Sequence, residues 1–411
     1  MRANQTILSL ALSVVTTVCL MPASADEAAR DKQGLEAAID AIQPIFNARV
    51  RYEGVDQDGV AETADALTYR LRVGFETGAV ADTKFLIDFD HIEDLVDDFN
   101  STINGKTQFP VVADPNATEL NRIQLTNTSL PETSITLGRQ RIILDDSRFV
   151  GNVGWRQNEQ TFDGLRVQNT SVDKVTIDVS YISQINRIFG DDSPSGVWEG
   201  DSFIVNANRS TKIGNVTGFA YLLDIDNAGG VFSSQTIGAR LSGAQSVGQG
   251  KFSYLASIAQ QTDYGSSPFD YSADYFLAEG VYGLNGLSAG VGYERLGGDD
   301  ERAFQTPLAT LHKFQGWADK FLATPTTGLE DIYVKASYAP QVTGPLKGTK
   351  FVAVYHDFSS DVGGGDFGTE VNLLATTKWK KLGFTAKYAD FTSDGFATDT
   401  SKIWLQVDFG F

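Results

Sequence analysis

Basic side chains at alternate positions in the first half of the chain are the residues best suited to bind a solute. Ten of the seventeen arginines fall between residues 49 and 166. A guanidinium group stays protonated and binds a carboxylate through two parallel hydrogen bonds. The alternating set that would contact an anionic solute is Arg49, Arg51, Arg70, Arg72, Lys84, Arg122 and Arg166, with Arg240, Lys335 and Lys387 adding charge from later segments.

These basic residues have two interpretations, and both stay open. They could form a track along which an anionic solute moves. They could instead crosslink the protein by pairing with the acidic residues that alternate in the same segments, which are Glu53, Asp88, Asp90 and Asp178.

Catalytic and metal chemistry find little support in the sequence. His91 and His356 each lie near carboxylates, but no serine is placed beside either of them as a nucleophile would require. Residues 56–59 begin like a calcium loop but lack its later ligands. The single cysteine, Cys19, falls in an expected leader. We therefore expect no enzyme activity, no metal and no cofactor.

The charge balance excludes one class of partner. The 411 residues carry 33 Lys+Arg against 52 Asp+Glu, a formal charge of −19. Nucleic-acid binding depends on clustered positive charge. We therefore expect no nucleic-acid partner.

The elements that position the basic residues are predicted to be β-strands, because apolar and polar residues alternate from Phe46 onward. From Leu67 to Phe75, for example, every second residue is apolar and Arg70 and Arg72 fall between them. A soluble β-sandwich would also alternate. However, many segments approach ten residues, the length of a tilted membrane strand. Their polar face carries Arg, Asp and Gly, and aromatic residues end the apolar face, as in outer-membrane barrels.

Connection lengths give a second indication of a barrel. About 18 candidate strands are joined by connections that alternate between long and short. Long loops at one end and tight turns at the other are typical of bacterial outer-membrane barrels. The long connections lie near 54–66, 95–115, 144–160, 188–200, 297–328 and 394–400, and the short ones near 78–82, 130–133, 170–173, 211–214, 283–286 and 380–382. The predicted fold is an all-β, antiparallel, up-and-down transmembrane barrel of about 18 strands.

The two ends of the chain indicate export and membrane assembly. Residues 1–25 have the charged, apolar and small-residue parts of a secretory signal peptide. Residues 26–44 form a predicted periplasmic helical extension that ends at Pro44, which leaves 45–411 for the barrel. The last strand alternates from Ile403 to a terminal aromatic, Phe411, a pattern that resembles the signal read by the outer-membrane assembly machinery.

Two stretches, 138–164 and 304–321, resemble those of the alginate export family of outer-membrane barrels. The resemblance implies an 18-stranded barrel whose electropositive lumen passes an anionic polysaccharide. The motifs that carry it are GRQR at 138–141, GWRQNEQTFDG at 154–164, FQTPL at 304–308 and GWADKF at 316–321.

The same resemblance implies that Arg139 and Arg141 are inward arginines. Ile135 and Leu137 occupy the same alternating positions as these arginines and should face lipid. On an unbroken strand, Arg139 and Arg141 would then face lipid as well. Either Gly138 is a bulge that resets the register, or both arginines lie above the membrane.

The predicted function is a porin-like channel of the cell outer membrane for an anionic or sugar-like solute, including an anionic polysaccharide. Barrels of this size leave a water-filled lumen, and the expected partners are lipid, the solute and the assembly machinery. A short helix from Leu308 to Leu322, inside the longest loop, either constricts the mouth or packs on itself. The alternative function is an outer-membrane binding or adhesion protein that acts through its extracellular loops.

Overall fold

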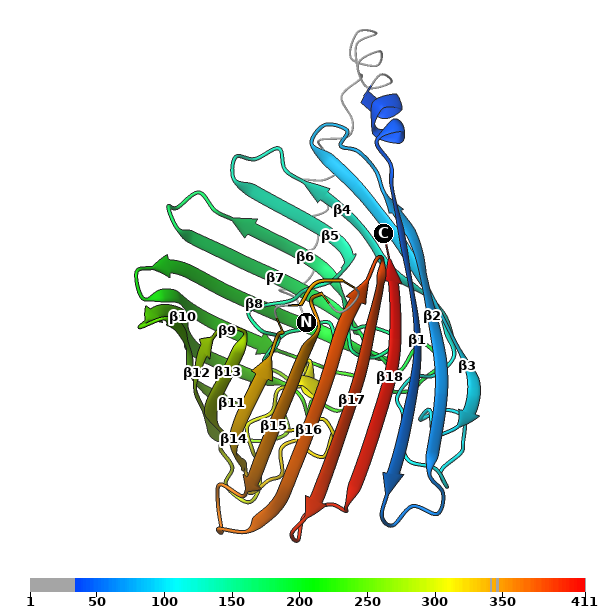
Figure 1. Ribbon diagram of the computed structural model, residues 1–411. Coiled ribbons are helices and arrows are strands. Elements are labelled where there is room, and N and C mark those ends of the chain that lie inside the picture. The colour runs from blue at the N-terminus through cyan, green and yellow to red at the C-terminus, as the bar shows by residue number, and fades with distance from the viewer. Residues whose placement is uncertain (1–33, 341, 345–346, 411) are drawn as a thin grey trace.

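The alternating residues form eighteen antiparallel strands, β1 to β18, and pairing of β1 with β18 closes them into a barrel (Figure 1). The computed structural model describes residues 34–340, 342–344 and 347–410. The strands are β1 Gln43–Gln57, β2 Ala64–Glu76, β3 Thr83–Asp98, β4 Ala117–Asn127, β5 Thr133–Gln140, β6 Thr161–Asn169, β7 Val175–Asn186, β8 Val197–Thr211, β9 Gly214–Leu223, β10 Ser234–Val247, β11 Gly250–Thr262, β12 Ser272–Leu284, β13 Leu287–Leu296, β14 Leu329–Tyr338, β15 Lys350–Ser359, β16 Asp366–Trp379, β17 Leu382–Ser393 and β18 Thr400–Gly410. The predicted fold is confirmed.

Burial alternates along the strands and separates an inner from an outer face. On β2, Arg70 and Arg72 are buried, whereas Leu71 and Val73 are exposed. Large apolar side chains are exposed in this way around the barrel, and such a belt is stable against lipid hydrocarbon. The predicted location in the outer membrane follows from this surface and from the closed barrel.

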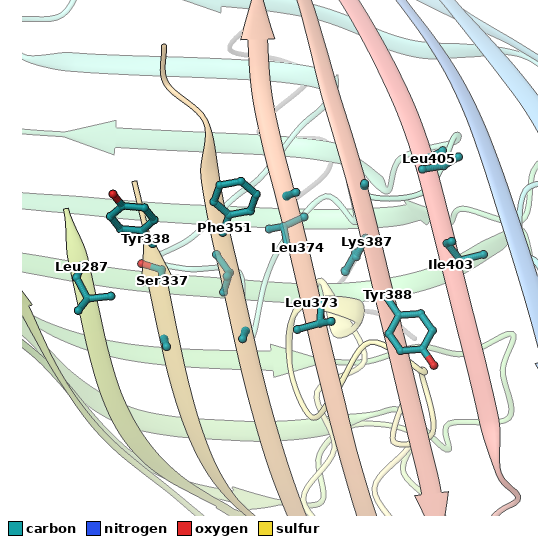
Figure 2. Close-up of a pocket in the computed structure, with 15 residues that line it drawn as sticks. Leu287, Ser337, Tyr338, Phe351, Leu373, Leu374, Lys387, Tyr388, Ile403 and Leu405 are labelled. Carbon is teal, nitrogen blue, oxygen red and sulfur yellow. The ribbon is translucent and has the colours of Figure 1, made fainter. Parts of the chain in front are cut away.

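Part of the outer face is shown in Figure 2, where side chains from β13 to β18 line an apolar hollow of about 510 Å³. Leu287, Phe351, Leu373 and Leu405 contribute to this lining and are exposed. The hollow therefore belongs to the lipid-facing surface and not to a path through the barrel.

Most connections sort by length between the two ends, as predicted, although the one between β14 and β15, at the turn end, is long. Turns such as 248–249 and 380–381 lie at one end, and long connections, including 99–116, 141–160 and 297–328, lie at the other. The turn end also carries the C-terminal end of β18 and a helix over residues 34–40 (Figure 1). Among the described residues, no helix is both long and apolar enough to cross a bilayer.

Two predicted helices differ from the structure. The described N-terminal helix spans 34–40, and β1 begins at Gln43, so Pro44 lies within β1 opposite Phe75 and does not mark a helix end. Proline is tolerated near the beginning of a strand. The region from Leu308 to Leu322 contains a single 3-10 turn, Leu311–Lys313, and no longer helix.

The absence of a longer helix between Leu308 and Leu322 has a backbone cause. Gln315, Gly316 and Asp319 all have positive φ angles, of 47°, 80° and 62°. A right-handed helix cannot continue through such residues. The apolar residues of this region are buried by contacts with the barrel, as shown by Leu308 and Phe321. The predicted signal peptide and Phe411 lie outside the described residues.

Candidate functional site

Three long connections fold into the barrel and bond to one another there. The Gly151 N–H donates to the Leu308 carbonyl at 2.9 Å, which joins the β5–β6 connection to the β13–β14 connection. The Gln157 N–H donates to Asp114 Oδ1 at 2.8 Å, which joins the β3–β4 connection to them. Because their partners include inward side chains of the strands, these connections narrow the lumen. Long connections without regular structure are often functional.

Arginines of β1 hold the β5–β6 connection. The Arg49 Nη1 group lies 3.1–3.2 Å from three consecutive carbonyl oxygens, those of residues 154–156. Arg49 also pairs with Asp408 at 2.8 Å. Arg51 is buried and pairs with Asp114 at 2.5 Å. These guanidinium groups therefore anchor a loop as well as contributing positive charge.

Arg70 and Arg72 of β2 hold the next part of the same connection. Arg72 pairs with Asp90 at 2.6 Å and with Glu159 at 2.7 Å. Arg70 donates to the Gln157 carbonyl at 3.2 Å and makes no ion pair with the carboxylates of the described residues. Arg70 thus retains a positive charge that the wall does not neutralise.

The other predicted pore-lining residues form ion pairs, so the crosslinking interpretation accounts for much of their geometry. Glu53 also pairs, at 3.0 Å, with Arg156 of the β5–β6 connection. The pairs are Lys84 with Glu76 at 2.9 Å, Arg122 with Asp88, Arg139 with Asp163 at 2.8 Å, Arg141 with Glu159, and Arg166 with Asp178 at 2.5 Å.

Arg139 lies at the long-loop end of β5. The pairing of β5 with both neighbours runs through Gly138 without a register shift, so Gly138 does not act as a bulge. Arg139 therefore lies on the same face of β5 as Leu137, which is exposed. Arg141 follows the strand and reaches Glu159 inside the barrel.

A second cluster of ionisable side chains, on the wall formed by β17 and β18, was not predicted from the sequence. Asp319 of the β13–β14 connection pairs with Lys402 at 2.9 Å, with Arg156 at 3.2 Å and with His312 at 2.7 Å. The His312 Nε2 atom is 2.6 Å from the Lys387 ammonium. The alternation placed Lys387 inward, but no pattern indicated that His312 would meet it.

The ionisable loop residues of this cluster are strongly perturbed. Burial lowers the pKa of His312 to about 3. The charge of Asp319 opposes this shift, whereas Lys387 and Arg156 lower the pKa further. Burial alone would raise the pKa of Asp319, but His312, Lys402 and Arg156 outweigh it and hold that pKa well below its ordinary value. His312 is thus neutral and Asp319 ionised at neutral pH.

A cavity of about 330 Å³ opens between these connections and the inner face of β16 and β17. Its lining contains two lysines, two tryptophans and three threonines, and no carboxylate. The lining residues are Trp155, Thr310, His312, Lys313, Trp317, Leu374, Thr376, Thr385 and Lys387. Within the part of the chain that the structure describes, no group of three His, Cys, Asp or Glu residues is arranged to hold a metal ion.

A closed 18-stranded barrel with an exposed apolar belt and inserted loops has the fold of an outer-membrane, porin-like channel. Three solved structures similar to this chain are OccK9 (OpdG) and OpdK with vanillate, both of Pseudomonas aeruginosa, and OccAB4 of Acinetobacter baumannii. Their sequence identities are 16%, 12% and 14%, with TM-scores of 0.70, 0.70 and 0.68. The matches cover 91%, 90% and 90% of this chain, and 100%, 98% and 98% of those chains.

These neighbours correct the sequence-based resemblance. They are OccK/OprD porins and not alginate exporters, so the resemblance to the alginate export family is wrong. The short motifs that suggested it lie in the β5–β6 and β13–β14 connections and in the adjoining ends of β5 and β6. No protein-family model and no curated protein match the sequence.

Proposed function

We propose that the protein is a passive outer-membrane channel that prefers small anionic solutes. The observation that carries the proposal is that a buried wall cation, Arg70, has no carboxylate within 4.0 Å among the described residues, although the lumen around it is full of ion pairs. Charge in a narrow pore acts at short range, because salt screens charges separated by more than about 8 Å. The acidic loops outside therefore contribute less to selectivity than Arg70.

The inserted connections support a small solute in preference to a polymer. They join three parts of the chain across the lumen, through the bonds at Gly151 and Gln157. A polysaccharide would need this structure to be displaced. One neighbour, OpdK, was solved with vanillate, a small carboxylate.

The test is the reversal potential of the purified protein in a planar bilayer under a potassium chloride gradient. We expect open channels that prefer chloride. A cation-preferring channel would contradict the anion proposal. The absence of conductance would instead favour the alternative of a binding or adhesion protein with a closed lumen.

A further inference from the structure

We propose that the outer face of β14 to β17 binds an anionic phospholipid of the periplasmic leaflet. The phosphate lies at lysines of the turn end, and an acyl chain lies in the apolar hollow of about 510 Å³ (Figure 2). The turns of outer-membrane barrels face the periplasm, so the periplasmic leaflet borders these lysines. This inference concerns the lipid-facing surface and does not depend on the proposed selectivity of the lumen.

Basic residues are sorted to one half of the turn end. Five windows of sequence around the turn-end connections between β8 and β17 contain eight Lys or Arg residues and no Asp or Glu, in a chain with a formal charge of −19. The windows are 207–218, 243–254, 280–291, 336–352 and 374–386, and the basic residues are Arg209, Lys212, Lys251, Lys347, Lys350, Lys378, Lys380 and Lys381. The connections β2–β3, β4–β5 and β6–β7 each carry an acid instead, namely Asp82, Glu132 and Asp173.

Three of these basic residues, Lys350, Lys378 and Lys380, lie beside the hollow, and we call them the rim lysines. Lys350 begins β15, Lys378 is near the end of the neighbouring strand β16, and Lys380 follows in the next turn. All three are exposed, and none pairs with a carboxylate of the described residues, whereas the inward Lys335 and Lys402 both do. The rim lysines therefore present charge that the protein does not neutralise.

Lys380 is held on the lipid side of the rim. Its ammonium lies 5.0 Å from the ring centroid of Trp379. Trp379 is exposed and shares the outward face of β16 with Ala375, which lines the hollow. An aromatic face stabilises a cation without neutralising it. Lys380 is thus directed to the headgroup region and keeps its charge for a phosphate.

The hollow begins close to the rim lysines. Ala375 precedes Lys378 by three residues, which is about 10 Å along a strand. The hollow exists because four of its outward side chains are small, and these are Ala336, Ala353, Ala375 and Ala386. Ala336 is the cross-strand partner of Ala353, and Ala375 is that of Ala386. Since lipid hydrocarbon surrounds the strands at this depth, an acyl chain fills the hollow.

Aromatic side chains mark the boundary between the hollow and the rim lysines. Tyr338 and Phe351 are cross-strand partners at the turn end of β14 and β15, and both are exposed at the edge of the hollow (Figure 2). With Trp379 they form the girdle that outer-membrane barrels place at the membrane interface. Lys350 and Lys380 each adjoin a girdle residue in sequence, so their long side chains reach the phosphates.

A phospholipid uses both parts of this surface, because its phosphate matches the lysines and its chain matches the hollow. A soluble anion would use the lysines alone. Basic clusters next to a membrane are typical sites for anionic lipids, and each nearby lysine strengthens binding to an anionic surface about fivefold.

The experiment measures lipid binding to the purified full-length protein in detergent by native mass spectrometry. The probes are dioleoylphosphatidylglycerol, which is anionic, and dioleoylphosphatidylcholine, which has the same chains and no net charge. We expect the wild type to bind phosphatidylglycerol at least about fivefold more tightly than phosphatidylcholine. Equal affinity for the two lipids would overturn the proposal.

Lys380→Gln removes one rim charge. It should weaken binding of phosphatidylglycerol about fivefold and leave that of phosphatidylcholine nearly unchanged. The matched control is Lys174→Gln, in the β6–β7 turn. Lys174 is also an exposed turn lysine with a positive φ angle, 59° against 56° for Lys380, but it lies 3.8 Å from Asp173. Equal effects of the two substitutions would assign the binding to overall charge and overturn the site.

Ala386→Phe fills the hollow without changing charge, and it tests the site independently if Lys380→Gln fails to fold. It should weaken binding of both lipids and preserve their ratio, and unchanged binding would overturn the place of the acyl chain. Glycerol 1-phosphate carries the phosphate without chains. If it displaces phosphatidylglycerol at equal concentration, the ligand is a soluble anion and the lipid proposal fails. Reversal potentials test the channel function separately from all these outcomes.

Discussion

At the scale of the residue, the inward arginines both anchor inserted loops and contribute positive charge to the lumen. A guanidinium group has N–H donors on three nitrogens, so the two N–H bonds of Arg49 Nη1 can be shared among three carbonyls of residues 154–156 while its Nε–H donates to Asp408. Lysine, with a compact ammonium group, does not span such a set of acceptors. Substitution of an arginine therefore changes loop position and lumen charge together.

Arg70 and Arg72 provide the first prediction. Replacing both with glutamine removes two charges from β2 and leaves Asp90 without its arginine partner. We expect reversal potentials under a salt gradient to shift toward cations, with the permeability ratio changing roughly fivefold per charge removed. Arg209→Gln, at an exposed position of β8, is the control. Unchanged selectivity in the double variant would contradict an arginine contribution.

Lys320, in the β13–β14 connection, provides a prediction about pH. Burial, helped by the charge of Lys402, lowers the pKa of Lys320 to about 8. Lys320 is therefore mainly charged at pH 7 and mainly neutral at pH 9. Because deprotonation removes a positive charge, anion preference should fall as pH rises from 7 to 9. In Lys320→Met this fall should be absent, and an identical fall in that variant would assign the response to another group.

At the scale of the element, one carboxylate of the wall contacts the backbone of the β13–β14 connection directly. Glu370 of β16 is buried and accepts hydrogen bonds from the backbone N–H groups of Trp317 and Ala318, the latter at 2.9 Å. Gly316 permits this contact, since a Cβ atom there would lie 2.2 Å from Glu370 Oε2. The connection is therefore fastened to the wall at a point that requires both glycine and glutamate.

Glu370 gives the prediction for this element. A buried N–H group left without its acceptor costs about 1–3 kcal/mol. Glu370→Ala should therefore raise the population of the released connection by at least about tenfold, seen as larger and noisier single-channel conductance. Glu370→Gln retains a carbonyl acceptor and should stay close to the wild type. Quiet wild-type conductance in Glu370→Ala would show that the other contacts suffice.

The N-terminal helix gives a second prediction at this scale. Residues 34–40 reach the barrel through a hydrogen bond from the Gly78 N–H to the Ala38 carbonyl at 3.0 Å. Leu35 and Ile39 are about half exposed, at 54% and 53%. We propose that this extension is dispensable for barrel closure. A variant lacking residues 26–42 should fold in detergent and remain heat-modifiable on gels, and failure to fold would make the helix structural.

The strands could be predicted from the sequence because their signal is local. Alternation along β2 places Arg70 and Leu71 on opposite faces without knowledge of any other strand. The inserted loops could not be predicted in this way. Arg51 contacts Asp114, and His312 contacts Lys387, across 63 and 75 residues of sequence. The alternation along a strand does not predict which distant residues come into contact. The prediction of a helix from Leu308 to Leu322 was wrong for a related reason. The apolar residues of this region pack on distant parts of the barrel and not along one face of a helix.

At the scale of the whole molecule, the last strand provides the remaining prediction. β18 pairs with β17 and with β1, so it completes the barrel. Deleting Phe411 should reduce the heat-modifiable, membrane-inserted fraction of the protein, because the terminal aromatic belongs to the proposed assembly signal. Replacing Phe411 with Tyr keeps an aromatic ring and should restore insertion. Normal insertion of the deletion variant would count against this signal.

The seam between β1 and β18 also sets the order of folding. Arg49 and Asp408 meet across 359 residues, so this is a contact of very high sequence separation. Such contacts form slowly, because the entropy of closing a long loop opposes them before they stabilise the protein. Until then the sheet has two unpaired edges, which invite association with other chains. Substitutions along this seam should consequently lengthen the lifetime of an aggregation-prone intermediate and act on the rate of assembly.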